Sequence, residues 1–136
     1  MRTARFRSDY QVNATDNLML QVGVARGERE IDSIALQSVE DRHIKTNFEQ
    51  IKWQRQIGSN NALSLQFFHT VENNTEIFDV VLPSFGQVVR DTSTRAERFD
   101  LEFQHTHQIQ KNTRLVWGWE LRQDSAKGLQ IFGTDP

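Results

Sequence analysis

Strict alternation of side-chain type from Phe99 to Ile109 constrains the fold more than any other feature of this sequence. Odd positions carry an apolar side chain, an aromatic ring or a histidine, and even positions are polar. In a helix this alternation would spread both classes around the cylinder, whereas in a strand it gives one apolar and one polar face. The segment is therefore predicted to be a β-strand in a sheet with one wet face.

The alternation resumes after Gln110-Lys111-Asn112, which predicts a hairpin with a short turn. The apolar face of the returning strand consists of Leu115, Trp117, Trp119 and Leu121. The register that aligns the two apolar faces pairs Phe103 with Trp119, Leu101 with Leu121, Asp100 with Arg122 and Glu102 with Glu120. The aspartate–arginine pair is favourable, and the glutamate pair is unfavourable unless a base from another strand lies between the carboxylates.

Two earlier stretches repeat this pattern around turn residues, Asn13-Ala14-Thr15-Asp16-Asn17 in the first and Gly58-Ser59-Asn60-Asn61 in the second. The sequence therefore predicts three hairpins, over about 4–27, 43–72 and 97–124. Residues 1–136 are expected to form one partial β-barrel domain, an all-β, antiparallel up-and-down meander of about six strands.

Short turns alternate with two long loops, over about 28–42 and 73–96. Bacterial outer-membrane barrels sort their connections in this way, with short periplasmic turns and longer extracellular loops. Strands of about 10 or more residues also suit a tilted membrane crossing. Within the second loop, Ile77–Pro83 predicts a small strand or cap in an ordered loop, and a buried connection between sheets is the alternative.

Composition excludes several classes of function. The net charge is −2, so no basic excess favours nucleic acid, and the absence of Cys rules out disulfides and thiol nucleophiles. The hydrophobic fraction is 37% with 10% aromatics, which suits a sheet with one wet face better than a closed core.

The sequence contains no run of about 18 apolar residues, so it predicts no membrane-spanning helix. Met1–Arg7 is basic but has no apolar segment after it, so it is not a signal peptide, and the chain is either cytosolic or a fragment exported by a signal elsewhere.

The last two hairpins resemble the barrel of TonB-dependent outer-membrane receptors. The resemblance lies in the succession of Ala62–Phe68, Arg98–His105 and Asn112–Gly118, the last with a Leu-Val-Trp-Gly segment after the short turn, and it is best over residues 62–128. It implies a barrel of roughly 22 strands with a plugged lumen in the outer membrane of a Gram-negative bacterium. It also implies uptake of a scarce nutrient such as an iron–siderophore complex, powered by the TonB complex through the plug domain.

The chain departs from that family because it contains no plug domain and no recognisable TonB box. Six strands cannot close a wall in lipid, since open edges are not tolerated in hydrocarbon. The chain is therefore expected to be a fragment of such a transporter, not an enzyme, with no cofactor, no metal site and no catalytic residues.

The alternation of apolar and polar side chains predicts which residues face lipid and which face the lumen. The lipid-facing belt is predicted to contain Trp53, Phe67, Phe103, His105, Trp117 and Trp119. The wall of the wet lumen is predicted to contain a network of Lys52, Asp100, Glu102, Glu120 and Arg122. Arg90, Arg95 and Arg98, at or near the end of the second long loop, are candidates for attracting an anionic substrate.

Other interpretations compete with these. His105 and His107 share a face and suggest a metal site, but a third ligand is missing nearby. Asp100, Glu102 and Glu120 suggest a strand-rich hydrolase, and the three Trp suggest a stacking platform for sugar or nucleic acid. The main alternative function is a soluble β-barrel or β-sandwich module that binds a small ligand, with the apolar face packed inward.

Overall fold

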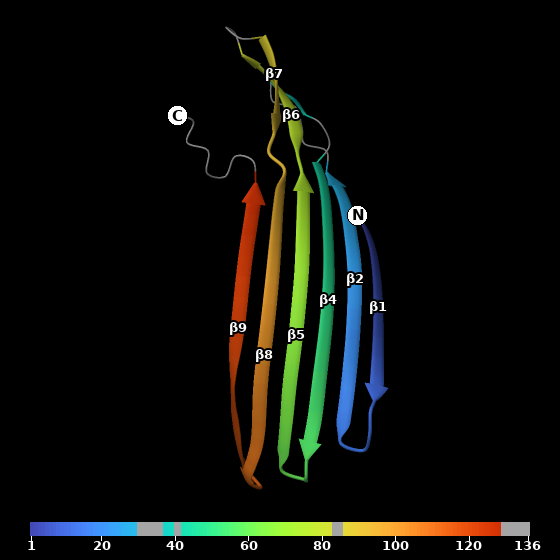
Figure 1. Ribbon diagram of the computed structural model, residues 1–136, viewed down its shortest axis with the longest axis vertical. Coiled ribbons are helices and arrows are strands. Elements are labelled where there is room, and N and C mark those ends of the chain that lie inside the picture. Colours follow the sequence, from blue (N-terminus) through green and yellow to red (C-terminus); the bar gives the residue numbers. More distant parts are fainter. Residues whose placement is uncertain (30–36, 40–41, 83–85, 129–136) are drawn as a thin grey trace.

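The structure is a computed structural model that describes residues 1–29, 37–39, 42–82 and 86–128. Six strands form one antiparallel sheet in chain order: β1 (Arg2–Gln11), β2 (Asp16–Arg29), β4 (Arg42–Ile57), β5 (Asn61–Thr75), β8 (Thr94–Gln110) and β9 (Thr113–Gly128). Figure 1 shows them side by side, with β1 and β9 at the two edges. The predicted all-β, up-and-down meander is confirmed, as a single open sheet. Among the described residues, no helix is long and apolar enough to cross a membrane.

Three short turns join the strands at one end of the sheet, the lower end in Figure 1, which we call the turn end. In the first turn the Asn13 side-chain oxygen accepts hydrogen bonds from the backbone N–H groups of Thr15 (2.8 Å) and Asp16 (2.9 Å). Asparagine favours such turns because its side chain mimics a backbone acceptor. In the second turn Gly58 has a φ of 62°, a conformation that glycine adopts without steric cost.

The opposite end of the sheet, the loop end, carries the long connections. They contain three further strands, β3 (Gln37–Val39), β6 (Ile77–Leu82) and β7 (Gly86–Asp91), which form a second, small sheet in the order β3-β6-β7. β6 and β7 extend beyond the large sheet in Figure 1. The expected local strand therefore exists as β6, while Pro83 lies outside the described residues. Strands β5 and β8 also reach further into the expected loop, to Thr75 and from Thr94.

The register of the last hairpin is the predicted one. Phe103 faces Trp119, Leu101 faces Leu121, Asp100 faces Arg122 and Glu102 faces Glu120. The irregularity between Gln108 and Gln110 lies next to the turn and leaves these pairs unaffected. A two-residue turn and matched alternation together fix the pairing, since a slip by one residue would reverse both faces.

The described residues contain almost no enclosed core. Val71 is the one hydrophobic residue among them that is buried, at 9% exposure. The fold is therefore held by the β-ladder and by contacts within each face. The edges β1 and β9 have no further strand beside them in the part of the chain that the structure describes.

Candidate functional site

One face of the large sheet carries rows of apolar side chains, because residues paired across strands point to the same side. We call it the apolar face. One row consists of Tyr10, Leu18, Trp53, Leu65, Phe103 and Trp119. The next row consists of Ser8, Leu20, Ile51, Phe67, Leu101 and Leu121. The six residues predicted as a lipid-facing belt all lie on this face.

No second layer covers the apolar face in the described part of the chain. Its exposed side chains include Leu121 at 64%, Tyr10 at 63%, Phe6 at 58% and Trp117 at 50%. Soluble monomers rarely expose a continuous apolar surface of this extent, and such surfaces mark contacts with lipid or with other proteins.

Aromatic rings contact one another along the β8–β9 part of this face. The Phe103 ring centroid lies 5.6 Å from that of Trp117 and 5.8 Å from that of Trp119. The His105 ring meets Trp117 edge-on at 5.4 Å. These rings form one cluster toward the turn end, where amphipathic side chains such as Trp and His suit an interface between water and lipid.

The apolar stretches of β2 and β9 lie at different levels along the strands, while on β8 the stretch ends at Phe103, in the same row as Leu18. On this face of β2 the apolar residues run from Leu18 to Val24, and on β9 they run from Leu115 to Leu121. The register places Leu18 in the same row as Trp119, so the band on β9 begins four residues closer to the turn end, at Leu115. This offset is about 14 Å along the strands over four strand spacings of about 4.8 Å, a slope of roughly 35°.

The opposite face, which we call the polar face, is lined mainly by polar and charged side chains. One row consists of Asp9, Met19, Lys52, Gln66, Glu102 and Glu120, and the next of Arg7, Gln21, Gln50, Phe68, Asp100 and Arg122. All five residues predicted to form a lumen-wall network lie on this face. Their network differs from the expected one: Arg122 Nε contacts Asp124 of its own strand at 2.9 Å, although Asp100 lies directly opposite it.

Among the described residues no base lies between Glu102 and Glu120 to relieve the repulsion that the sequence predicted. Lys52 shares their row but is separated from Glu102 by Gln66. The unfavourable pair of facing carboxylates is therefore a feature of this surface. An open, water-filled side of the sheet tolerates it, because water screens charges that a closed core would not.

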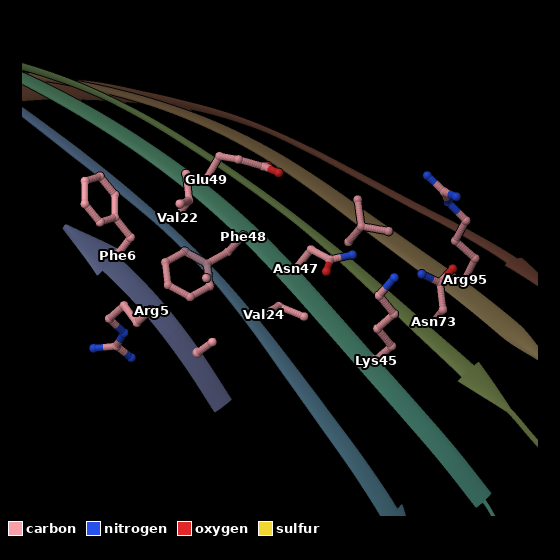
Figure 2. Close-up of a pocket in the computed structure, with 13 residues that line it drawn as sticks. Arg5, Phe6, Val22, Val24, Lys45, Asn47, Phe48, Glu49, Asn73 and Arg95 are labelled. Carbon is pink, nitrogen blue, oxygen red and sulfur yellow. The ribbon is translucent and has the colours of Figure 1, made fainter. Parts of the chain in front are cut away.

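A hydrophobic cluster interrupts the polar face at β4. The Phe48 ring packs over Gly23, stacks 6.2 Å from Phe68 and lies under the Arg5 guanidinium at 5.7 Å. A groove that begins at Arg5 and Phe48 is lined for most of its length by side chains of the apolar face and reaches Lys45 and Arg95 (Figure 2). Among its described lining residues there is no cluster of catalytic groups.

A buried carboxylate at the turn end was not predicted from the sequence. Asp16, the first residue of β2, is 3% exposed and accepts hydrogen bonds from Arg55 Nε (2.7 Å), Arg55 Nη2 (2.9 Å) and Trp53 Nε1 (3.0 Å). The Arg55 guanidinium, helped by Asn13, Thr15 and Trp53, holds the pKa of Asp16 well below its usual range. This contact connects the first hairpin to β4. No local sequence pattern predicts it, because the two residues are 39 positions apart.

His69 forms a second polar contact that sequence analysis missed. On the apolar face of β5, its Nδ1 lies 2.8 Å from Glu49 Oε2 and its Nε2 lies 3.0 Å from Glu97 Oε1. Its ring also stacks on Phe99 at 4.3 Å. His69 thus bridges β4 and β8 at a level beyond the Phe67 row, toward the loop end.

The three arginines predicted to attract a substrate are not brought together. Arg95 and Arg98 lie three residues apart on β8 and point to opposite faces. Arg98 Nε contacts Asp124 at 2.6 Å, and Arg95 Nη2 lies 3.7 Å from Glu97. Arg90 belongs to β7, and its side chain lies outside the described residues.

The two histidines considered as a metal site lie on one face, with ring centroids 6.3 Å apart. His107 hydrogen-bonds with Asn61, its cross-strand partner. Within the ranges that the structure describes, no group of three or more His, Cys, Asp or Glu side chains is arranged to hold a metal ion.

Comparison with known proteins adds no relative: no protein-family model, curated protein or solved structure matches this chain.

Proposed function

We propose that this chain supplies six adjacent strands to the wall of a larger outer-membrane β-barrel, with the apolar face toward lipid and the polar face toward a wet lumen. The observation that carries the proposal is the apolar face of the sheet, which is exposed in the described residues and lies opposite a polar face. In a membrane barrel the strands tilt by about 35–45°, so the apolar stretches of distant strands lie at different levels of the register. The offset between β2 and β9, with a slope of roughly 35°, agrees with such a tilt.

The apolar stretches are short enough to fit within a membrane. On β2 the crossing part is taken as Leu18–Val24, with Asp16 outside it at the turn end. The stretch on β9, Leu115–Leu121, also covers six residue steps. At about 3.4 Å per residue and a tilt of about 40°, six steps span roughly 16 Å of height, which is less than the apolar band of about 25 Å in such barrels.

The open edges require further strands. In hydrocarbon, each unpaired backbone N–H and C=O costs several kcal/mol, so β1 and β9 must pair with strands beyond those described. We therefore propose that the six strands act as a segment of a wall. A soluble sandwich would instead need a second layer packed on the apolar face.

Within that class, we propose a TonB-dependent receptor that takes up a scarce nutrient such as an iron–siderophore complex. The support is the resemblance over residues 62–128 and the separation of short turns from long connections. This finer proposal expects a plug domain and additional strands to be encoded on either side of this segment. Flanking coding sequence without either would contradict the receptor assignment.

Intrinsic tryptophan fluorescence tests the membrane proposal. The chain is refolded from urea into phosphatidylcholine vesicles, with and without brominated acyl chains. Copies of the chain can cover the open edges there by pairing β1 of one copy with β9 of the next. Trp53, Trp117 and Trp119 lie on the apolar face, so we expect blue-shifted emission that bromine quenches. Emission that bromine leaves unchanged, from a chain that melts cooperatively as a monomer without detergent, would contradict the proposal.

A further inference from the structure

A row of basic side chains crosses the apolar face at its loop end. The register places Arg2, Arg26, Lys45, Asn73, Arg95 and Lys127 directly opposite one another, one residue from each of the six strands. We call it the basic row. Figure 2 shows Lys45, Asn73 and Arg95 in succession across β4, β5 and β8.

Three bases of this row lie side by side without an acidic partner. Arg2, Arg26 and Lys45 are all exposed, and neighbouring strands bring them to a spacing of about 4.8 Å between backbones. Like charges directly opposite each other destabilise a sheet. Within the described residues none of the three makes an ion pair, and Glu28, the nearest carboxylate along β2 on this face, lies 3.9 Å from His43. Such a cluster calls for an external anion.

Two of the three bases also border the apolar band. On β1 and β2 the next side chains on this face are Ala4 beside Arg2 and Val24 beside Arg26, and both continue the band. On β4, Asn47 and Glu49 separate Lys45 from Ile51, as Gln123 and Ser125 separate Lys127 from Leu121 on β9. A ligand that fills the corner formed by β1 and β2 must therefore combine a negative charge with an apolar body.

We propose that Arg2, Arg26 and Lys45 bind the phosphate groups of anionic lipids whose acyl chains lie against the β1–β2 part of the apolar face. The inference rests on the proposed membrane orientation. Guanidinium groups pair with phosphate oxygens through two parallel hydrogen bonds, and the lysine ammonium adds a point charge. Bound phosphates relieve the repulsion within the basic row and fix the level of the sheet in the membrane.

Lipid selectivity tests this inference. Partition of the full 136-residue chain is measured by tryptophan fluorescence with vesicles of phosphatidylcholine alone and with vesicles containing phosphatidylglycerol. We expect the wild-type chain to prefer the anionic vesicles. The triple variant Arg2→Gln, Arg26→Gln, Lys45→Gln should lose that preference by a factor on the order of 10–100, with a weaker salt dependence.

A matched triple variant on the polar face, Arg7→Gln, Lys52→Gln, Arg122→Gln, removes the same charge and should keep the preference. Equal losses in the two triple variants would overturn the inference in favour of general charge attraction. Inorganic phosphate that binds the wild-type chain without vesicles as tightly as anionic lipid does would overturn the lipid assignment. Loss of bromine quenching in phosphatidylcholine alone would instead overturn the membrane proposal, so the two failures are distinguishable.

Discussion

The two faces of the large sheet are formed by the same strands but differ in the side chains that they carry and in the contacts of those side chains. The apolar face gathers Trp, Phe and Leu into a band that no layer of the described residues covers, while the polar face carries exposed charges, some of them in ion pairs. The difference teaches that the surroundings, more than an internal core, select the side chains of this sheet. A change on one face, compared with a matched change on the other face or at a neighbouring site, tests this difference.

A charge placed in the middle of the apolar band should have the largest effect. Leu65 lies between Trp53 and Phe103 in the band. In vesicles, Leu65→Arg should lower the free energy of unfolding by about 2–4 kcal/mol, since arginine at the membrane midplane is poorly solvated. Urea unfolding in lipid measures it. Gln66→Arg, one residue along and on the polar face, should change the value by less than about 0.5 kcal/mol; equal effects would break the distinction between the faces.

Filling the space under Phe48 should have the next largest effect. A Cβ at Gly23 would lie 2.3 Å from Phe48 Cε1, so Gly23→Val displaces the ring from Phe68 and Arg5. We expect a loss of about 1–3 kcal/mol in unfolding free energy. Gly27→Val is the control because a Cβ there meets nothing within 4 Å. A similar loss in both variants would mean that β2 tolerates no β-branched residue at either position.

Removing the buried carboxylate at the turn end should have a smaller effect. Asp16→Ala leaves the Trp53 and Arg55 donors without their acceptor, and the unfolding midpoint should fall by a few degrees. Asp9→Ala, which breaks the exposed contact with Arg7, should leave the midpoint nearly unchanged.

The contribution of Asp16 should also depend on pH. Its pKa is lowered in the folded state, so its carboxylate stabilises the fold fully above the ordinary value of 3.8 and progressively less as the pH falls below it. The difference in midpoint between wild type and Asp16→Ala should therefore shrink on acidification below pH 3.8. A difference that grows at low pH would contradict the assignment of Asp16 as an ionised acceptor.

The smallest effect is expected where two carboxylates face each other on the polar face. Glu102→Gln removes one charge of the Glu102–Glu120 pair and should raise the unfolding free energy by about 0.2–1 kcal/mol. Glu72, whose cross-strand neighbours are Thr46 and Ala96, gives the control Glu72→Gln, for which no gain is expected. A gain in both would point to overall charge instead of the pair.

The sequence was most informative where a short turn fixes the register. In the last hairpin, alternation on both sides of two turn residues is sufficient to pair Phe103 with Trp119 and Glu102 with Glu120. The assignment of Trp53, Lys52 and Gln66 to their faces follows from the same alternation.

The sequence contains no such local signal for the register between strands that the long connections join. The contacts of Asp16 with Arg55 and of His69 with Glu97 join separate hairpins, so they depend on how those hairpins align. Asp100 faces Arg122 as predicted, but the ion pair of Arg122 is with Asp124, which lies within reach on the same strand. Alternation fixes the face of a side chain but not which of several neighbours it contacts.

Site-directed labelling along β8 tests the central claim most directly. The chain contains no Cys, so single cysteines at positions 100–104 can each carry an environment-sensitive dye without background. In vesicles, dyes replacing Leu101 and Phe103 should emit as in hydrocarbon and be quenched by lipid-attached quenchers, whereas dyes replacing Asp100, Glu102 and Gln104 should be quenched by aqueous iodide. Equal response to both quenchers at all five positions would show that neither face of this sheet belongs in lipid.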